Sequence, residues 1–173
     1  MTDEIDLDNL REFTAWKQRN PAFTLLDFVY QALPADLAVA ICELFWPRLE
    51  QHRGGIFLAE GFSAENFESW SANLGGDIAK IEATMNHRHV GDFFVASHDL
   101  SIANLTRIGE VLRQTWTSRL HAAFPDARIV IQGQVEEDAE DYVITFFQQQ
   151  ASDPSVSSAS ASTRTRSGRS GRS

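Results

Sequence analysis

The stretch IANLTRIGEVLRQTWTSRLHAA, residues 102–123, has the most regular pattern in the chain. Its apolar residues recur at steps of three or four, which places them on one face of an α-helix about six turns long. Pro125 and Asp126 follow and end the pattern. The residues on this face are Ile102, Leu105, Ile108, Leu112, Trp116 and Leu120. We therefore expect a long amphipathic helix from about 102 to 123.

Two further runs come after this helix, RIVIQGQV at 128–135 and YVITFF at 142–147. Both are rich in β-branched or aromatic residues, which favours strands. Six mostly acidic residues separate them, and this spacing is typical of an antiparallel hairpin. The sequence therefore predicts a C-terminal β-hairpin.

Helix signals dominate the first part of the chain. Asn20-Pro21 closes a first helix, and Thr24 with Asp27 resembles a capping box that opens a second. Pro34 suits the first turn of a third helix, which Pro47 ends or bends. We predict helices at 6–19, 24–33, 34–45 and 64–74, a further turn near Leu49, a strand at 56–59, and a buried face on the third helix made of Leu37, Ala40, Ile41, Leu44 and Phe45.

Residues 77–97 fit two patterns. Ile78, Ile81 and Met85 are spaced for a helix, whereas the alternation that ends in His87 and His89 is typical of a strand. Both interpretations stay open. Residues 92–95 are predicted to form a second short strand.

These elements predict an α+β fold: N-terminal helices, then a small mixed or antiparallel sheet with helices packed on one face, and the C-terminal hairpin. We expect one domain over 1–150, with a helical part at 1–53 and the sheet and its helices at 54–150. Residues 151–173 contain nine Ser and four Arg and almost nothing apolar. Such a composition predicts a disordered tail.

Charge separates the body of the chain from this tail. The whole chain carries −9, but residues 1–150 hold 11 basic and 23 acidic residues, a net −12. So acidic a body disfavours direct nucleic-acid binding by the folded domain and suits a basic protein partner, unless the charge serves only solubility. The four Arg of the tail offer nucleic acid a weak, salt-sensitive contact at best.

The single cysteine, Cys42, lies in an apolar helical stretch and is predicted to be a buried small hydrophobe. One cysteine cannot form an internal disulfide. The N-terminus is acidic where a secretory signal would be basic, and no run reaches the roughly 18 apolar residues of a membrane span. We therefore expect a cytoplasmic protein that does not contact membranes.

Histidines are concentrated in one short segment. His87, His89 and His98 fall within twelve residues, and an extended His-x-His pair offers two ligands to one divalent transition metal ion. The candidates for a further ligand are Glu60, Glu82, Asp92, His98 and Asp99. The alternative is that the two histidines are hydrogen-bonded structural residues. No other cofactor is indicated.

The predicted hairpin connection is strongly acidic, with Glu136, Glu137, Asp138, Glu140 and Asp141 in six residues. It is interpreted either as a solvated tip that protects the sheet edge from aggregation or as a docking surface for a basic partner. The nucleophile-elbow and nucleotide-binding glycine motifs are absent, so we assign no catalytic residue.

Three functions are consistent with these features. The first is a small acidic cytosolic binding protein that docks a basic protein partner, as an immunity protein, inhibitor or adaptor does. The second is a metal-binding enzyme or sensor that uses the His-x-His pair. The third is a nucleic-acid accessory protein that acts through the tail. Neither the oligomeric state nor an enzymatic activity follows from the sequence.

Overall fold

The computed structural model describes residues 7–95, 97 and 100–149. The predicted tail and His98 lie outside these residues. The helices are α1 (Arg11–Arg19), α2 (Leu25–Ala32), α3 (Ala35–Phe45), α4 (Ala64–Asn73), α5 (Ile78–Met85) and α6 (Ile102–Ala123). The strands are β1 (Leu49–His52), β2 (Gly55–Leu58), β3 (Arg88–His89), β4 (Ile129–Glu136) and β5 (Asp141–Gln148). Short 3-10 helices occur at η1 (Leu7–Asn9), η2 (Gly91–Phe94) and η3 (Glu137–Ala139).

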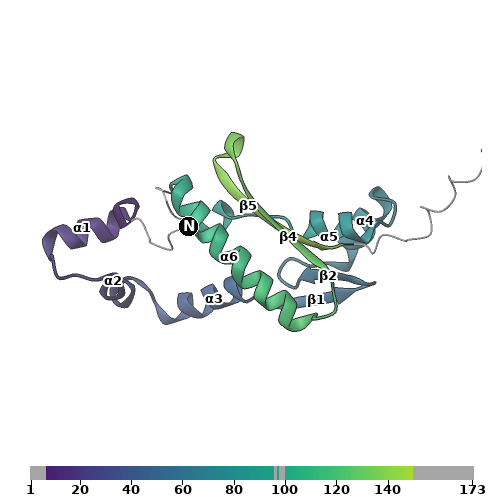
Figure 1. Ribbon diagram of the computed structural model, residues 1–173, viewed down its shortest axis with the longest axis horizontal. Helices are drawn as coiled ribbons and strands as arrows, with labels where there is room; N and C mark the ends of the chain where they lie inside the picture. The colour runs from purple at the N-terminus through teal and green to yellow at the C-terminus, as the bar shows by residue number, and fades with distance from the viewer. Residues whose placement is uncertain (1–6, 96, 98–99, 150–173) are drawn as a thin grey trace, which may run out of the picture.

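The strands form two small antiparallel sheets, which confirms the α+β class. One is the β1-β2 hairpin, and the other has the order β3-β5-β4. The predicted C-terminal hairpin is β4-β5, in register from Ile129↔Gln148 to Glu136↔Asp141. Figure 1 shows α6 running beside this hairpin, whose tip projects from the body of the molecule.

The main core lies between α6 and the three-stranded sheet. Alternate residues of β5 point to the same side of a strand, so Tyr142, Ile144 and Phe146 all face the helix. They pack in one buried cluster with the apolar face predicted for α6, including Leu105, Leu112, Trp116 and Leu120. The long helix therefore matches its predicted extent, and its predicted face is buried except at Ile102, which is exposed, and Ile108, which is half-buried.

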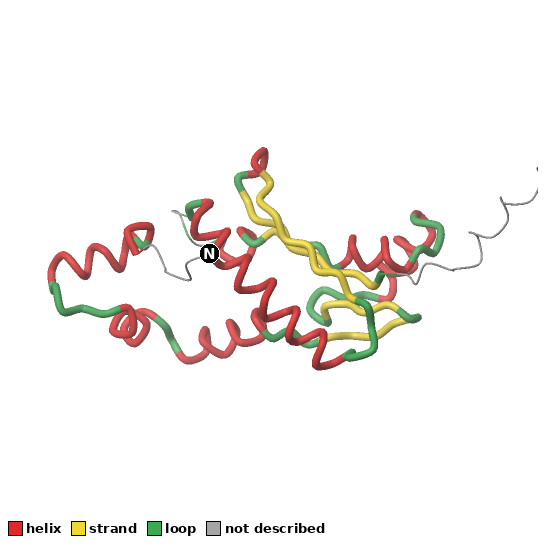
Figure 2. Tube along the Cα trace, viewed as in Figure 1, coloured by secondary structure: helices red, strands yellow, loops and turns green. Residues whose placement is uncertain are grey.

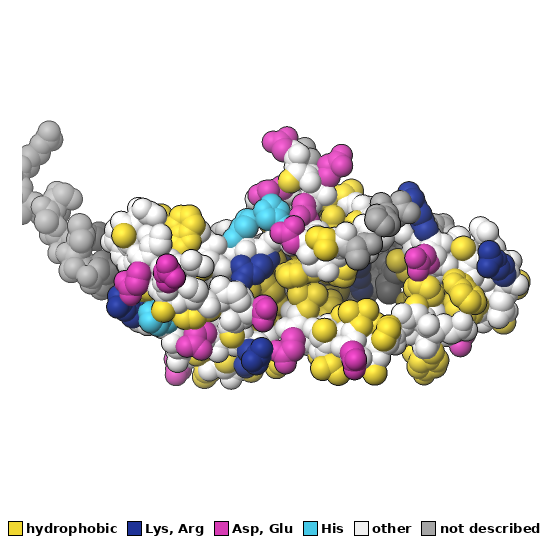
Figure 3. Space-filling view, turned by 180° about the vertical axis from the view of Figure 1, so that it is seen from behind, with side chains coloured by type: hydrophobic (Ala, Val, Ile, Leu, Met, Phe, Trp, Pro, Cys, Tyr) yellow, Lys and Arg dark blue, Asp and Glu magenta, His cyan; other side chains and the backbone are white. Residues whose placement is uncertain are grey.

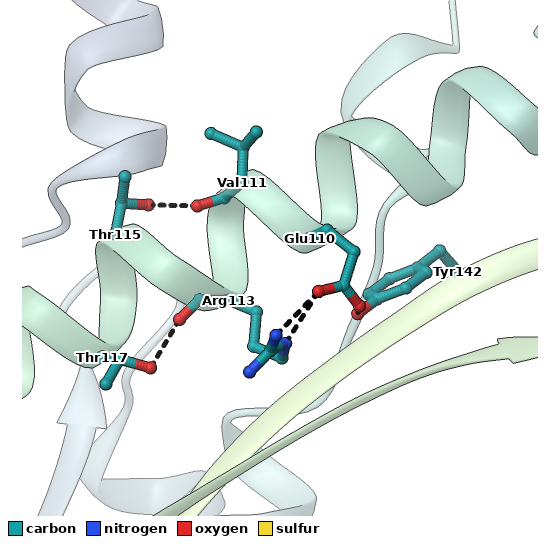
Figure 4. Close-up of polar contacts among 6 residues, drawn as sticks. All are labelled: Glu110, Val111, Arg113, Thr115, Thr117 and Tyr142. Carbon is teal, nitrogen blue, oxygen red and sulfur yellow. Dashed lines mark hydrogen bonds and ion pairs between the residues drawn. The ribbon is translucent and has the colours of Figure 1, made fainter. Parts of the chain in front are cut away.

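Tyr142 crosses this core and reaches a polar group on the other side. Its hydroxyl donates to the Glu110 carboxylate at 2.7 Å, and Arg113 donates to the same carboxylate at 2.8 Å (Figure 4). Two glycines make room for the ring. A Cβ at Gly109 would lie 2.1 Å from the Tyr142 ring, and one at Gly133 would lie 2.3 Å from its hydroxyl.

Helix α5 joins the two sheets through buried polar side chains. Glu82 accepts the backbone N–H groups of Ile56 in β2 and Gln148 in β5, both at 2.7 Å. Asn86 accepts the N–H of Leu58 at 3.0 Å and donates to the carbonyl of Phe146 at 3.1 Å. These side chains occupy the space between the strand edges and satisfy backbone groups that water does not reach.

Both patterns seen in residues 77–97 are correct over different parts. The helix α5 uses the first spacing and ends at Met85, and β3 then uses the alternation at Arg88–His89. The predicted strand at 92–95 is wrong, because residues Gly91–Phe94 form η2. The backbone N–H of Gly91 donates to the Asp141 carboxylate at 2.9 Å, and that of Phe93 donates to the carbonyl of Val90 at 3.2 Å, so the chain turns.

Strand β1 replaces the extra turn that we predicted near Leu49. It pairs with β2 from Leu49↔Leu58 to His52↔Gly55. The two linking residues, Arg53 and Gly54, have φ of 46° and 84°. Positive φ at both positions is the geometry of the tight turn that closes two-residue hairpins.

Helices α1–α3 form an arm that extends from the body (Figure 2). The capping box of Thr24 and Asp27 is present at the start of α2. The predicted first helix is divided into η1 and α1, with Leu10 between them. The predicted buried face of α3 is correct only at its C-terminal end, where Leu44 and Phe45 pack half-buried against the main core; Leu37 and Ala40 are exposed, and so is Cys42, which we predicted to be buried. The reason is that α3 is covered on one side only, where its C-terminal end meets α6: the carbonyl of Leu44 accepts the indole N–H of Trp116 at 2.9 Å.

Within the described residues, no single helix is long and apolar enough to cross a membrane. Helices α2 and α3 reach that length and hydropathy only when taken together, and they are bent by 112° at the break between them.

Candidate functional site

The two histidines of the His-x-His motif lie side by side. His87 follows the C-cap of α5, and His89 lies in β3, where it pairs with Val143 of β5. Because the segment is extended here, both rings project from the same face of the sheet. Their Nε2 atoms are 3.4 Å apart, with ring planes at 74°. Both side chains are half-buried.

Asp141 joins the histidine pair from the neighbouring strand. Its Oδ2 lies 3.2 Å from Nδ1 of His89. Its Oδ1 accepts the backbone N–H groups of Gly91 and Tyr142 at 2.9 and 2.7 Å. The Asp141 side chain is only 13% exposed, whereas that of His89 is 38% exposed. Asp141 is therefore built into the sheet and is not free for a partner, unlike the role we predicted for it in the acidic hairpin connection.

These three side chains form a chain of contacts. Nδ1 of His89 faces the Asp141 carboxylate, and Nε2 of the same ring faces Nε2 of His87. The arrangement has the parts of a proton relay or a metal-ligand pair: an anchored carboxylate, an oriented imidazole and a second imidazole within reach.

A small cavity of about 110 Å³ opens beside His87. Most of the residues that line it come from the face of the β4-β5 hairpin opposite α6: Gln132, Gln134, Glu136, Val143 and Thr145. Ile144, whose side chain faces α6, also borders it. In Figure 3, histidine side chains lie beside acidic side chains at the base of the hairpin on this face.

The other predicted metal ligands do not join the pair. His98 and Asp99 lie outside the described residues. Glu82 is fully buried and engaged by Ile56 and Gln148. In the part of the chain that the structure describes, no three His, Cys, Asp or Glu side chains are already gathered as a metal centre.

The acidic tip of the hairpin is smaller than predicted. Asp138 and Glu140 are exposed, and Glu136 is half-buried beside the cavity. Glu137 lies in η3 at the tip. Acidic side chains mark this projection in Figure 3.

A second candidate surface lies on α2 and α3, and our sequence interpretation missed it. Several large apolar side chains stand exposed here: Leu26 (57%), Val29 (40%), Tyr30 (73%), Leu37 (50%) and Val39 (67%). We call these five side chains the arm surface. The signal was present in the sequence, since both helices are apolar on most sides and a helix of that kind needs a cover.

A cavity of about 400 Å³ adjoins the arm surface, between α3 and the body. Its apolar walls include Ala40 and Leu44 of α3, Leu58, Phe93 and Trp116. Glu43, Arg48, Glu60 and Arg88 also line it. Figure 3 shows this hollow as an apolar area with basic and acidic side chains around it.

Arg88 separates this cavity from the histidine pair. Its guanidinium donates to the carbonyls of Met85, His87 and Glu60 at 2.8, 2.7 and 3.1 Å. Burial lowers the pKa of Arg88, partly offset by Glu60. These bonds fix the backbone at His87, so Arg88 holds one wall of the cavity and positions the histidine next to it.

Comparisons of the chain with protein-family models, with curated proteins and with solved structures found no match.

Proposed function

We propose that this protein is a cytoplasmic binding protein whose arm surface docks a basic protein partner. The observation that carries the proposal is the exposure of five large apolar side chains on α2 and α3. Exposed large apolar side chains gathered on two neighbouring helices favour an interaction with a partner. Binding of the partner would remove these side chains from water.

Burial of the arm surface supplies a favourable free energy of binding. Complete burial of a Val or Leu side chain contributes about 1.5–3 kcal/mol, so covering a half-exposed one contributes about 1 kcal/mol. Leu26, Leu37 and Val39 are each half or more exposed. The partner must therefore present apolar side chains of its own.

The charge around the arm surface favours a basic partner. No Lys or Arg occurs between Arg19 and Arg48, whereas Asp27, Asp36 and Glu43 lie in this stretch. Helices that bind anionic membrane surfaces carry Lys and Arg on their polar face, so this pattern favours a protein over a lipid surface. The acidic hairpin tip adds longer-range attraction for the same partner.

The adjoining cavity is suited to an anchor residue. Its volume of about 400 Å³ and its apolar walls match a large apolar side chain of the partner better than a charged one. Ala40 lines this cavity. We expect Ala40→Phe to fill it and to weaken docking at least ten-fold.

Cys42 allows a direct test, because it is exposed on α3 and is the chain's single cysteine. A photo-crosslinker attached to Cys42 should capture a basic protein in a native lysate. The matched control is Cys42→Ser with Ser69→Cys, which moves the crosslinker to an exposed position on α4.

The captured protein supports the proposal only if it also binds through the arm surface. Its affinity, measured with purified components, should fall at least ten-fold with Leu26→Asp or Val39→Asp. Adducts only with a second copy of this chain, or binding to neutral or anionic vesicles without a protein partner, would contradict it.

A further inference from the structure

We propose that His87 and His89 bind one divalent transition metal ion of the zinc class through their Nε2 atoms. The site lies on the face of the three-stranded sheet opposite α6. It uses none of the residues of the arm surface, so the test of this site is independent of the test of the proposed function.

The spacing of the two nitrogens fits a tetrahedral ion. A Zn²⁺ ion binds imidazole nitrogens at about 2.0–2.1 Å, which places two of them about 3.3–3.4 Å apart around a tetrahedron. The Nε2 atoms of His87 and His89 are 3.4 Å apart. An ion can therefore enter with little movement of either ring.

Asp141 supplies the orientation that metal-binding histidines usually need. Such a histidine donates its other ring N–H to a carboxylate or carbonyl, which fixes its tautomer and strengthens the ligand. Asp141 is the carboxylate in this position, because its Oδ2 lies 3.2 Å from Nδ1 of His89. The carboxylate is itself fixed by the N–H groups of Gly91 and Tyr142.

Gly91 makes this close approach possible. A Cβ at this position would lie 3.1–3.3 Å from the carboxylate atoms of Asp141. This is tighter than an ordinary van der Waals contact, so a larger residue would displace the group that orients His89.

Two positions of the tetrahedron remain for ligands other than histidine. The cavity of about 110 Å³ beside His87 has room for water, and Glu136 is one of its lining residues. Open positions of this kind are typical of metal ions that take up an exogenous ligand, in contrast to closed structural sites.

The test uses the full chain, purified without chelators or a nickel column. It is titrated with ZnCl₂, and binding is measured by calorimetry. We expect one equivalent to bind and to raise the melting temperature. His87→Gln and His89→Gln should each weaken binding at least ten-fold. His121→Ala removes an exposed histidine on α6 and is the control that should leave binding unchanged.

Asp141→Asn separates the orienting role from simple ligation. Its amide oxygen can still accept the N–H groups of Gly91 and Tyr142, but it is a weaker partner for His89, so we expect affinity to fall about 10–100-fold. Circular dichroism checks that each variant is folded. Failure to bind Zn²⁺, or binding that survives both histidine substitutions in folded protein, would overturn the proposal.

Discussion

The buried carboxylate of Glu82 accepts the backbone N–H of Ile56 at 2.7 Å and thereby links α5 to β2. The same carboxylate accepts the backbone N–H of Gln148 in β5, also at 2.7 Å. A single acidic side chain thus holds together two sheets that lie in different parts of the sequence. This link sets the position of α5 and of the histidines that follow it.

We expect Glu82→Ala to destabilise the fold by about 2–6 kcal/mol, because it leaves two N–H groups without a partner at about 1–3 kcal/mol each. Chemical denaturation measures this. Glu50→Ala, which removes an exposed carboxylate from β1, is the control and should change the free energy of unfolding by less than 0.5 kcal/mol, about the usual limit for surface changes. Equal effects of the two substitutions would contradict the linking role of Glu82.

The pH dependence of stability tests the same residue. Burial raises the pKa of Glu82 above its ordinary value of 4.5, although hydrogen bonds from Gln148 and Ile56 lower it in part. The folded protein therefore holds this proton more tightly than the unfolded chain does. The stability gained is present below pH 4.5 and is lost as the pH rises through the folded-state pKa.

We therefore expect the difference in unfolding free energy between wild type and Glu82→Gln to shrink as the pH rises above about 4.5. Denaturation at a series of pH values measures it. A difference that grows with pH over that range would mean that the carboxylate, and not the neutral acid, is favoured by the fold.

Gly109→Ala should destabilise the protein although it lies within α6. Alanine normally stabilises a helix interior by about 1 kcal/mol relative to glycine. Here its Cβ would lie 2.1 Å from the ring of Tyr142, so we expect a net loss of about 2 kcal/mol. In a Tyr142→Ala background the loss should disappear. If Gly109→Ala stabilises the wild-type chain, the packing of Tyr142 against α6 is not as described.

The acidic hairpin tip should act on the rate of partner binding more than on its lifetime. The rate is measured for association with the partner protein captured by the crosslinker on Cys42. The double substitution Asp138→Lys and Glu140→Lys should slow this association about ten-fold at low salt and much less at high salt. Stopped-flow mixing measures the rates. Glu50→Lys combined with Glu65→Lys changes the charge equally at exposed positions away from the tip and should have a smaller effect. If both double substitutions slow association equally, the attraction comes from the net charge of the protein and not from the hairpin tip.

Local periodicity was sufficient to predict the elements that build the main core. The apolar spacing of residues 102–123 identified α6, and the two β-rich runs identified the C-terminal hairpin. These predictions were correct because the type of each helix or strand follows from the residue pattern within that element alone. The α5–β3 segment was ambiguous because a helix and a strand share it.

Other features depend on residues that only the folded chain brings together. Asp141 is 52 positions from His89, so its role in orienting that ring could not be read from the motif. Strand β1 was missed because its turn places Arg53, not a glycine, at a positive φ. The apolar face of α3 was predicted as buried because periodicity identifies an apolar face but not what covers it.

The affinity of the captured basic protein for Val39→Asp, compared with Ser69→Asp, tests the docking role of the arm surface most directly. Val39 is 67% exposed on α3, and Ser69 is exposed on α4, so neither change disturbs the core. We expect Val39→Asp to weaken binding at least ten-fold and Ser69→Asp to leave it unchanged. Equal affinity for both variants would contradict the assignment of this surface as the binding site.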